Sequence, residues 1–124
     1  CKQRILLACT DDILKHTLLA MLEKTYSVLV SGEEDTIEKA SFYTPELTII
    51  DQDSFGQKTS TIIAEIIGKR AANDTSPILF LVSNEANAIN TNSLERIHYD
   101  ILKKPVSENS LLQIIGQSLR LYGK

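Results

Sequence analysis

The sequence predicts one α/β domain in which a five-stranded parallel sheet is packed between layers of helices. Five short apolar runs alternate with segments of helical spacing, as in repeated strand-helix units. The runs are rich in Ile, Leu and Val, which indicates strands buried on both faces. The chain has 124 residues, 43% of them hydrophobic, which is enough for one core and too few for two ordinary domains.

Five strands are predicted over residues 5–9, 26–30, 47–50, 78–82 and 101–102. Two helices are predicted in the first half of the chain. The first helix is predicted from one apolar stripe, formed by Ile13, Leu14, Thr17, Leu18, Met21 and Leu22. Ser31 and Glu34 have the spacing of a capping box, so we expect a second helix that carries Ile37, Ala40 and Phe42 towards the break before Pro45.

The second half continues the alternation. A third helix is predicted from paired apolar ridges at Ile62, Ile63, Ile66 and Ile67. The last helix is expected to begin at a Ser107 cap and to bury Leu111, Leu112, Ile115 and Leu119. Between them, residues 84–97 are rich in Asn and Ala, and their helix rests on three apolar anchors only, Ile89, Leu94 and Ile97.

Composition argues against several classes of protein. A net charge of −3 gives no broad basic surface, so direct binding of nucleic acid is not expected. No apolar run reaches the ~20 residues that cross a bilayer, so no membrane insertion is expected. Two cysteines, Cys1 and Cys9, form no disulfide framework, which fits a reducing, cytoplasmic setting. The start at Cys1 rather than Met indicates a domain cut from a longer protein, with a lipidated terminus as the alternative.

Charged and polar residues gather where the predicted strands end. These residues are Cys9, Thr10, Asp11, Asp12, Asp51, Asp53, Ser83 and Lys104. Carboxyl ends of parallel strands share one edge of the sheet, so these side chains are candidates for a common site. Carboxylates near one lysine can hold Mg²⁺, and an aspartate beside them can be phosphorylated while the cations offset the charge of the transferred group.

These residues resemble the receiver domains of two-component response regulators over nearly the whole chain. Residues 45–51 (PELTIID) are similar to the third strand of that family, which makes Asp51 the phosphoacceptor. Lys104 before Pro105 resembles its Lys-Pro signature and would contact the phosphoryl group. Residues 77–83 (PILFLVS) resemble its fourth strand, with Ser83 as a phosphoryl-contacting hydroxyl. The resemblance implies a doubly wound, flavodoxin-like (βα)5 fold with strand order 2-1-3-4-5.

The sequence also departs from the family pattern. Residues 4–8 (RILLA) match the first strand, but Cys9 and Thr10 stand where the acidic pair belongs, and Asp11 and Asp12 come two residues late. The Mg²⁺ ligands implied by the resemblance are Asp51, Asp11, Asp12 and the backbone carbonyl of Asp53, with helix capping as the alternative role of Asp11 and Asp12. Val82 and Ile101 occupy the switch positions, which predicts weak coupling to the surface and a degenerate receiver.

By resemblance, we expect Asp51 to accept a phosphoryl group from a histidine kinase or phosphotransfer protein. We expect no enzymatic activity beyond self-phosphorylation from small phosphodonors and autodephosphorylation. An output domain or a second copy would bind through the last two helices. One alternative is a phosphorylation-independent interaction module. Another is a phosphocysteine carrier like the phosphotransferase-system IIB domains that uses Cys9, although Asp11 and Asp12 would repel its phosphate. We expect His16 and His98 to be surface residues.

Overall fold

The computed structural model describes residues 2–83, 94 and 97–123. Five parallel strands form one sheet in the order β2-β1-β3-β4-β5, which confirms the predicted fold class and strand order. The strands are β1 (Arg4–Ala8), β2 (Ser27–Ser31), β3 (Leu47–Asp51), β4 (Ile78–Val82) and β5 (Tyr99–Lys103). Each lies within two residues of its predicted position.

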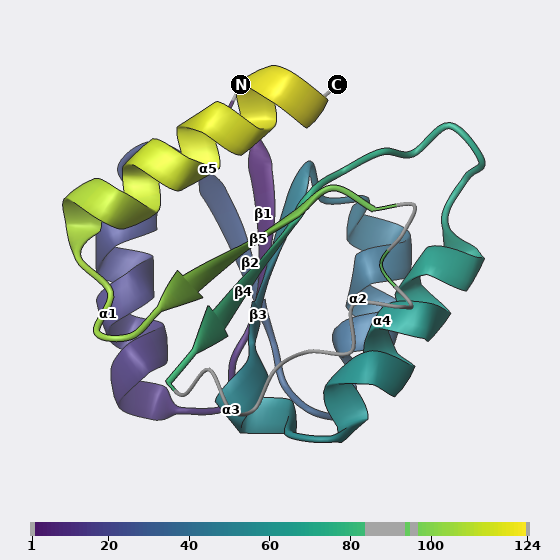
Figure 1. The fold of residues 1–124 in the computed structure, drawn as a ribbon, viewed down its shortest axis with the longest axis horizontal. Coiled ribbons are helices and arrows are strands. Elements are labelled where there is room, and N and C mark those ends of the chain that lie inside the picture. The colour runs from purple at the N-terminus through teal and green to yellow at the C-terminus, as the bar shows by residue number, and fades with distance from the viewer. Residues whose placement is uncertain (1, 84–93, 95–96, 124) are drawn as a thin grey trace.

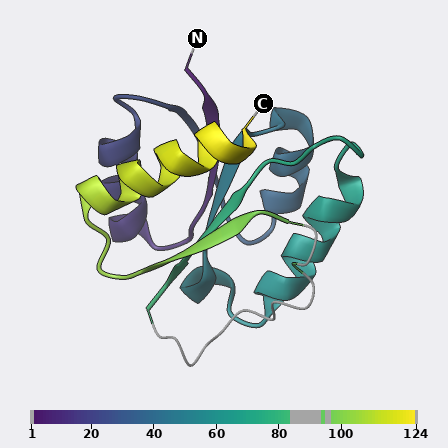
Figure 2. The ribbon, with the colours of Figure 1, turned by 45° about the horizontal axis from the view of Figure 1, so that its top comes forward.

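Helices cover both faces of this sheet. They are α1 (Asp12–Leu22), α2 (Thr36–Tyr43), α3 (Gln52–Phe55), α4 (Lys58–Lys69) and α5 (Glu108–Tyr122). Helices α1 and α5 lie on one face, and α2 and α4 lie on the other, with the short α3 at one edge (Figures 1 and 2). None of the helices in the described part of the chain is both long and apolar enough to cross a bilayer.

The core consists of two clusters, one on each face, because successive side chains of a strand point to opposite sides. Leu7 and Ile49 pack with residues of α1 and α5, whereas Ile50 and Phe80 pack with residues of α4. The strands β1, β3 and β4 are buried along nearly their whole length. Their rigid packing therefore fixes the position of the residues that follow them.

The predicted capping box is wrong. Ser31 is the last residue of β2, where it is buried and its Oγ lies 2.8 Å from Thr36 Oγ1. Asp35 is the residue before α2, and its carboxylate accepts a hydrogen bond from the amide of Gly32 at 2.7 Å. Because Ser31 belongs to β2, it cannot cap the helix, and α2 begins at Thr36, later than predicted.

The other helices follow the sequence with local differences. Ser107 caps α5 as predicted, because its Oγ accepts a hydrogen bond from the amide of Ser110 at 3.2 Å. Ile13 belongs to the predicted stripe of α1 but is 81% exposed. The helix predicted over residues 84–97 lies mostly outside the described residues. Of its anchors, Leu94 is buried in the cluster beneath α4 and Ile97 packs against that cluster.

Candidate functional site

The carboxyl edge of the sheet brings three strand ends together. Strand β3 ends at Asp51 and β4 ends at Val82, and β5 runs into Lys104. The amide of Lys104 donates to the carbonyl of Val82 at 2.8 Å, which fixes the lysine backbone beside β4. The Lys104–Pro105 peptide bond is cis. The hydrogen bond to Val82 holds the lysine backbone at the rim of the sheet.

Asp51 is the central carboxylate of this edge. It is only 1% exposed, and its Oδ1 lies 2.6 Å from Nζ of Lys104. Its other oxygen, Oδ2, accepts a hydrogen bond from Ser54 Oγ at 2.7 Å. A buried carboxylate normally requires a positive partner and hydrogen bonds, and Asp51 has both.

Lys104 links Asp51 to a second carboxylate. Its Nζ donates to Asp53 Oδ2 at 2.8 Å, and Ser83 Oγ donates to Asp53 Oδ1 at 3.0 Å. Burial opposes the charged ammonium, but the hydrogen bonds and charges of Asp51 and Asp53 outweigh it and raise the pKa of Lys104 above 10.5. The structure thus brings four of the predicted site residues into one network: Asp51, Asp53, Ser83 and Lys104.

Asp11 and Asp12 do not join this network. The Oδ1 of Asp11 accepts hydrogen bonds from the amides of Ile13 at 3.0 Å and Leu14 at 3.2 Å, which makes it the N-cap of α1. Asp12 forms an exposed ion pair with Lys15 at 3.0 Å. Both side chains have the capping and surface roles that short acidic residues favour at a helix start.

Cys9 occupies the place beside Asp51 instead. The thiol is 1% exposed and lies 3.6 Å from both Asp51 Oδ2 and the carbonyl oxygen of Asp11, so its single proton can go to either. Burial raises the pKa of the Cys9 thiol, and the nearby charge of Asp51 raises it further. A neutral thiol is a poor nucleophile, which argues against a phosphocysteine at this position.

The donor set fits Mg²⁺ poorly. Magnesium prefers oxygen ligands, but a protonated thiol lies where a second carboxylate would be expected, and both Asp51 and Asp53 are already paired with Lys104. The described residues contain no cluster of three or more His, Cys, Asp or Glu side chains that could hold a metal ion. Of the four predicted ligand residues, only Asp51 and Asp53 contact Lys104 at this edge of the sheet.

One residue of the site, Ser54, was not predicted from the sequence. Ser54 Oγ accepts a hydrogen bond from the amide of Thr10 at 2.9 Å while it donates to Asp51, so it joins the loop after β1 to the end of β3. Ser54 follows Asp51 by three residues, the spacing of one helical turn, because α3 starts directly after the strand. Because α3 covers only four residues, the sequence shows no helical period there that could have revealed Ser54.

The residues at the two predicted switch positions differ in burial. Val82 is buried at the end of β4, whereas Ile101 is 47% exposed in the middle of β5. Neither residue carries a polar group that could respond to a charge at Asp51. His16 and His98 are both exposed, and the His98 ring stacks on Tyr122 at a centroid distance of 3.8 Å.

We predict that Asp53 makes stability sensitive to acid. Partial burial would raise the pKa of Asp53, but hydrogen bonds from Lys104 and Ser83 prevail and lower it below the usual 3.8. A lowered folded-state pKa stabilises the fold above the unfolded value, and this contribution is lost as pH falls through the folded-state value. The difference in unfolding free energy between the wild type and Asp53→Asn should therefore be constant near neutrality and shrink below pH 3.8.

Urea unfolding at a series of pH values measures this difference. Glu65→Gln, which removes an exposed carboxylate from α4, is the matched control. A difference between wild type and Asp53→Asn that does not change with pH would contradict the assignment.

This chain resembles known proteins in its fold rather than in its sequence. No protein-family model matches the sequence, and no curated protein matches it either. Solved structures do match. The receiver domain of a sensor histidine kinase from Pseudomonas aeruginosa, described with a magnesium ion coordinated in its active site cleft, has a TM-score of 0.82 at 20% identity, with 97% of this chain and 99% of that chain covered.

Two further matches are regulators. A two-component response regulator from Clostridium difficile has a TM-score of 0.77 at 25% identity, with 96% and 97% of the two chains covered. A response regulator receiver modulated diguanylate cyclase from Pelobacter carbinolicus has a TM-score of 0.72 at 24% identity, with 97% and 94% covered. The five-stranded parallel fold of this chain is thus the one that these proteins share.

Proposed function

We propose that this chain, which has the fold of response-regulator receiver domains, is a cytoplasmic signalling domain that accepts a phosphoryl group on Asp51. The observation that carries the proposal is the ion pair of 2.6 Å between Asp51 Oδ1 and Lys104 Nζ at the carboxyl edge of the sheet. It joins a carboxylate nucleophile to a fixed positive charge in the position where open parallel sheets hold their ligands.

The transfer is a simple displacement. An oxygen of the Asp51 carboxylate attacks phosphorus, the bond from phosphorus to its previous carrier breaks, and an acyl phosphate forms. The carrier would be a phosphohistidine of a histidine kinase or phosphotransfer protein, or a small phosphodonor. Lys104 already lies against Asp51 and would offset charge on the transferred group. Beyond this self-phosphorylation and the later hydrolysis, we propose no enzymatic activity.

Magnesium would have only a minor role in this phosphoryl transfer. If the ion binds, Asp51 and Asp53 would hold it, and it would supply further positive charge for the phosphoryl oxygens. Because Cys9 replaces the second carboxylate, binding is expected to be weak. The positive charge of Lys104, which is part of the chain, is therefore the main electrostatic contribution.

The signal would arise from competition for Lys104 and Ser83. Both groups are held by Asp53 in the unmodified site, and a phosphoryl group adds about −1.5 to −2 charges that would attract them. Val82 and Ile101 carry no polar group, so the response at the outer surface is expected to be small. The partner, an output domain or a second copy, would bind through α5 and the segment before it.

A phosphorylation-independent interaction module is the second candidate. It is favoured by one specific observation, the burial of Asp51 to 1% exposure with Cys9 at its side in place of an acidic residue. In this case the network of Lys104 would serve stability only.

The experiment that separates the two candidates is an intact-mass measurement. The domain is incubated with acetyl phosphate, with and without MgCl₂, and weighed. We expect an adduct of one phosphoryl group that Asp51→Asn abolishes and that Asp12→Asn, a carboxylate on the surface of α1, retains. An adduct that is lost in Cys9→Ser but kept in Asp51→Asn would indicate the phosphocysteine carrier. The absence of any adduct would contradict the proposal and favour the interaction module.

A further inference from the structure

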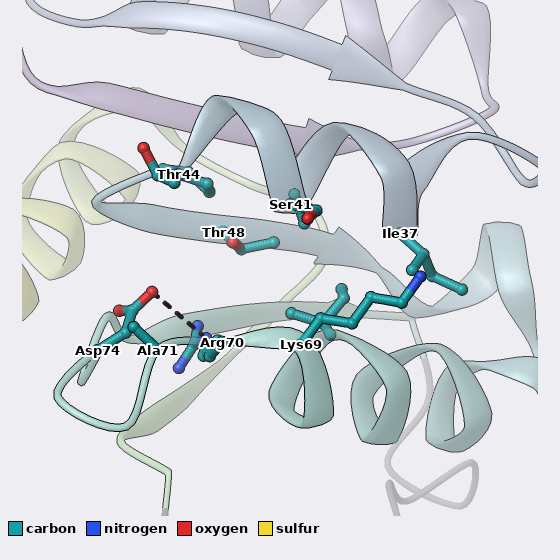
Figure 3. Close-up of a pocket in the computed structure, with 11 residues that line it drawn as sticks. Ile37, Ser41, Thr44, Thr48, Lys69, Arg70, Ala71 and Asp74 are labelled. Atoms are coloured by element: carbon teal, nitrogen blue, oxygen red, sulfur yellow. Dashed lines mark ion pairs between the residues drawn. The ribbon is translucent and has the colours of Figure 1, made fainter.

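A small cavity lies at the opposite end of the sheet from Asp51. Its volume is about 100 Å³, and its walls come from α2, the first half of β3, the end of α4 and the turn that follows α4 (Figure 3). Thr48 lies on its floor, three residues before the end of β3 at Asp51. The cavity therefore belongs to a different site from the one described above.

Arg70 gives the first reason to expect a ligand site in this cavity. Its side chain is only 12% exposed, and its one ion-pair partner among the described residues is Asp74, at 3.9 Å, beyond hydrogen-bond distance. Burial lowers the pKa of Arg70, and the charge of Asp74 only partly opposes this effect. A guanidinium has five N–H donors in a planar fork, and none of them makes a hydrogen bond with the described part of the chain.

Arg4, at the same end of the sheet, shows the usual arrangement. Its guanidinium donates to the carbonyls of Tyr43 at 3.2 Å and Thr44 at 2.9 Å, and it pairs with Glu46 at 3.5 Å. These bonds also fix the end of α2, which forms one wall of the cavity. A fixed wall beside an arginine that makes no side-chain hydrogen bond with the described residues fits a preformed site.

Thr48 is the second, independent sign. It is 1% exposed, and its Oγ1 has no hydrogen-bond partner among the described residues. A buried hydroxyl without a partner costs about 1–3 kcal/mol, so such groups in native proteins are generally satisfied by water or a ligand. The cavity is thus lined by a buried hydroxyl without a partner among the described residues and by a guanidinium that is available to an acceptor.

Charge and size define the ligand. Two cations, Lys69 and Arg70, and one carboxylate, Asp74, line the cavity, so it carries one net positive charge. Asp74 Oδ1 is occupied by the amide and hydroxyl of Ser76, at 3.0 and 2.5 Å. Figure 3 shows that Lys69 extends along the cavity towards Ile37, away from Arg70. A cavity of 150 Å³ accepts the six carbons of benzene, so this one accommodates about four or five non-hydrogen atoms.

We propose that this cavity binds a small oxyanion, specifically a short-chain monocarboxylate, with its carboxylate on Arg70 and Thr48. The guanidinium fork matches the two oxygens of a carboxylate, and the Thr48 hydroxyl donates to the same group. Ser41 and Thr44 also line the cavity, but most of the remaining wall is apolar and suits a short hydrocarbon tail; it is formed by Ile37, Ala40, Pro45, Ile66 and Ala71. A phosphate has no such tail and costs more to desolvate as a dianion.

Titration with sodium propionate, followed by amide NMR shifts, tests this proposal. Sodium chloride at equal ionic strength is the salt control, and inorganic phosphate is the competing oxyanion. We expect saturable shifts confined to the amides around the cavity, with a dissociation constant on the order of 1 mM. Arg70→Gln should weaken binding about tenfold and Thr48→Val about threefold, whereas Arg120→Gln on the exposed face of α5 should leave it unchanged.

Three outcomes would overturn the proposal. Propionate shifts that do not saturate, or that are equal in the wild type and both cavity variants, exclude a carboxylate site. Saturable binding of phosphate without binding of propionate contradicts the choice of a monocarboxylate. Circular dichroism establishes whether Arg70→Gln folds, and Thr48→Val, which preserves side-chain volume, provides the test if it does not.

Discussion

Replacing Cys9 with aspartate is expected to make the stability of the domain depend on Mg²⁺. The Cys9 thiol is buried at 3.6 Å from Asp51 Oδ2, so a carboxylate there adds a third negative charge to a site in which Lys104 is the one cation among the described residues. Without metal, Cys9→Asp should lower the free energy of unfolding by about 3 kcal/mol, because a buried charge lacks a partner. With Mg²⁺ in about hundredfold excess over its dissociation constant, about 2.7 kcal/mol should return.

Urea unfolding with and without MgCl₂ measures both effects. Cys9→Asn is the matched control, since it introduces a side chain of the same shape without the charge. The wild type should respond little to MgCl₂, because its thiol is a poor ligand for that ion. A gain from MgCl₂ in the wild type as large as that in Cys9→Asp would show that the thiol does not weaken the metal site.

Replacing Lys104 with methionine should have the other large effect. Asp51 is 1% exposed and would lose the ammonium that lies 2.6 Å from its Oδ1. Breaking a buried ion pair from one side costs about 3–5 kcal/mol, because the remaining charge keeps its desolvation penalty. Lys103→Met, one residue earlier at an exposed position of β5, should change stability by less than about 0.5 kcal/mol.

A double-mutant cycle gives the decisive measurement. Asp51→Asn removes the uncompensated charge, so the double variant Asp51→Asn/Lys104→Met should be more stable than the sum of the single changes predicts, by at least about 1 kcal/mol. Additive effects would contradict a direct ion pair. The pKa of Lys104 is raised above 10.5, so its contribution is fully present at neutral pH and is lost only as pH rises through that raised value.

The strands could be predicted because burial on two faces requires apolar residues throughout. Four predicted strands match the structure within one residue at each end. The fifth, predicted as residues 101–102, extends over Tyr99–Lys103. It lies at the edge of the sheet and is mostly only partly buried, so Asp100 and Lys103 are tolerated within it and conceal its length.

The helix boundaries were harder to predict because local polar residues have more than one use. Ser31 has the spacing of a cap but completes a strand, and this competition cannot be resolved without the sheet. Helix α3 covers four residues, too few to show a 3.6-residue period. Both differences arise where a strand joins a helix, and there tertiary pairing decides between the alternatives.

The residues of the candidate site that directly follow a strand could be predicted from the sequence. Asp51, Asp53, Ser83 and Lys104 were grouped from the sheet topology alone, and the structure places them in one network. Asp11 could not be placed in this way, because the free amides at the start of α1 attract its carboxylate. Position in the sequence therefore predicts proximity at this edge, whereas hydrogen-bond competition decides which side chain turns inward.

The hydroxyl of Ser54 connects the loop after β1 directly to the carboxylate of Asp51. Its single proton points to Asp51 Oδ2 while its lone pair receives the amide of Thr10. If a bond forms at Oδ2, the serine must reorient, and the Thr10 amide must then find water or another acceptor. The rate of hydrogen exchange at the Thr10 amide would consequently report phosphorylation of Asp51 at the end of β3. This readout does not depend on the two apolar residues at the switch positions.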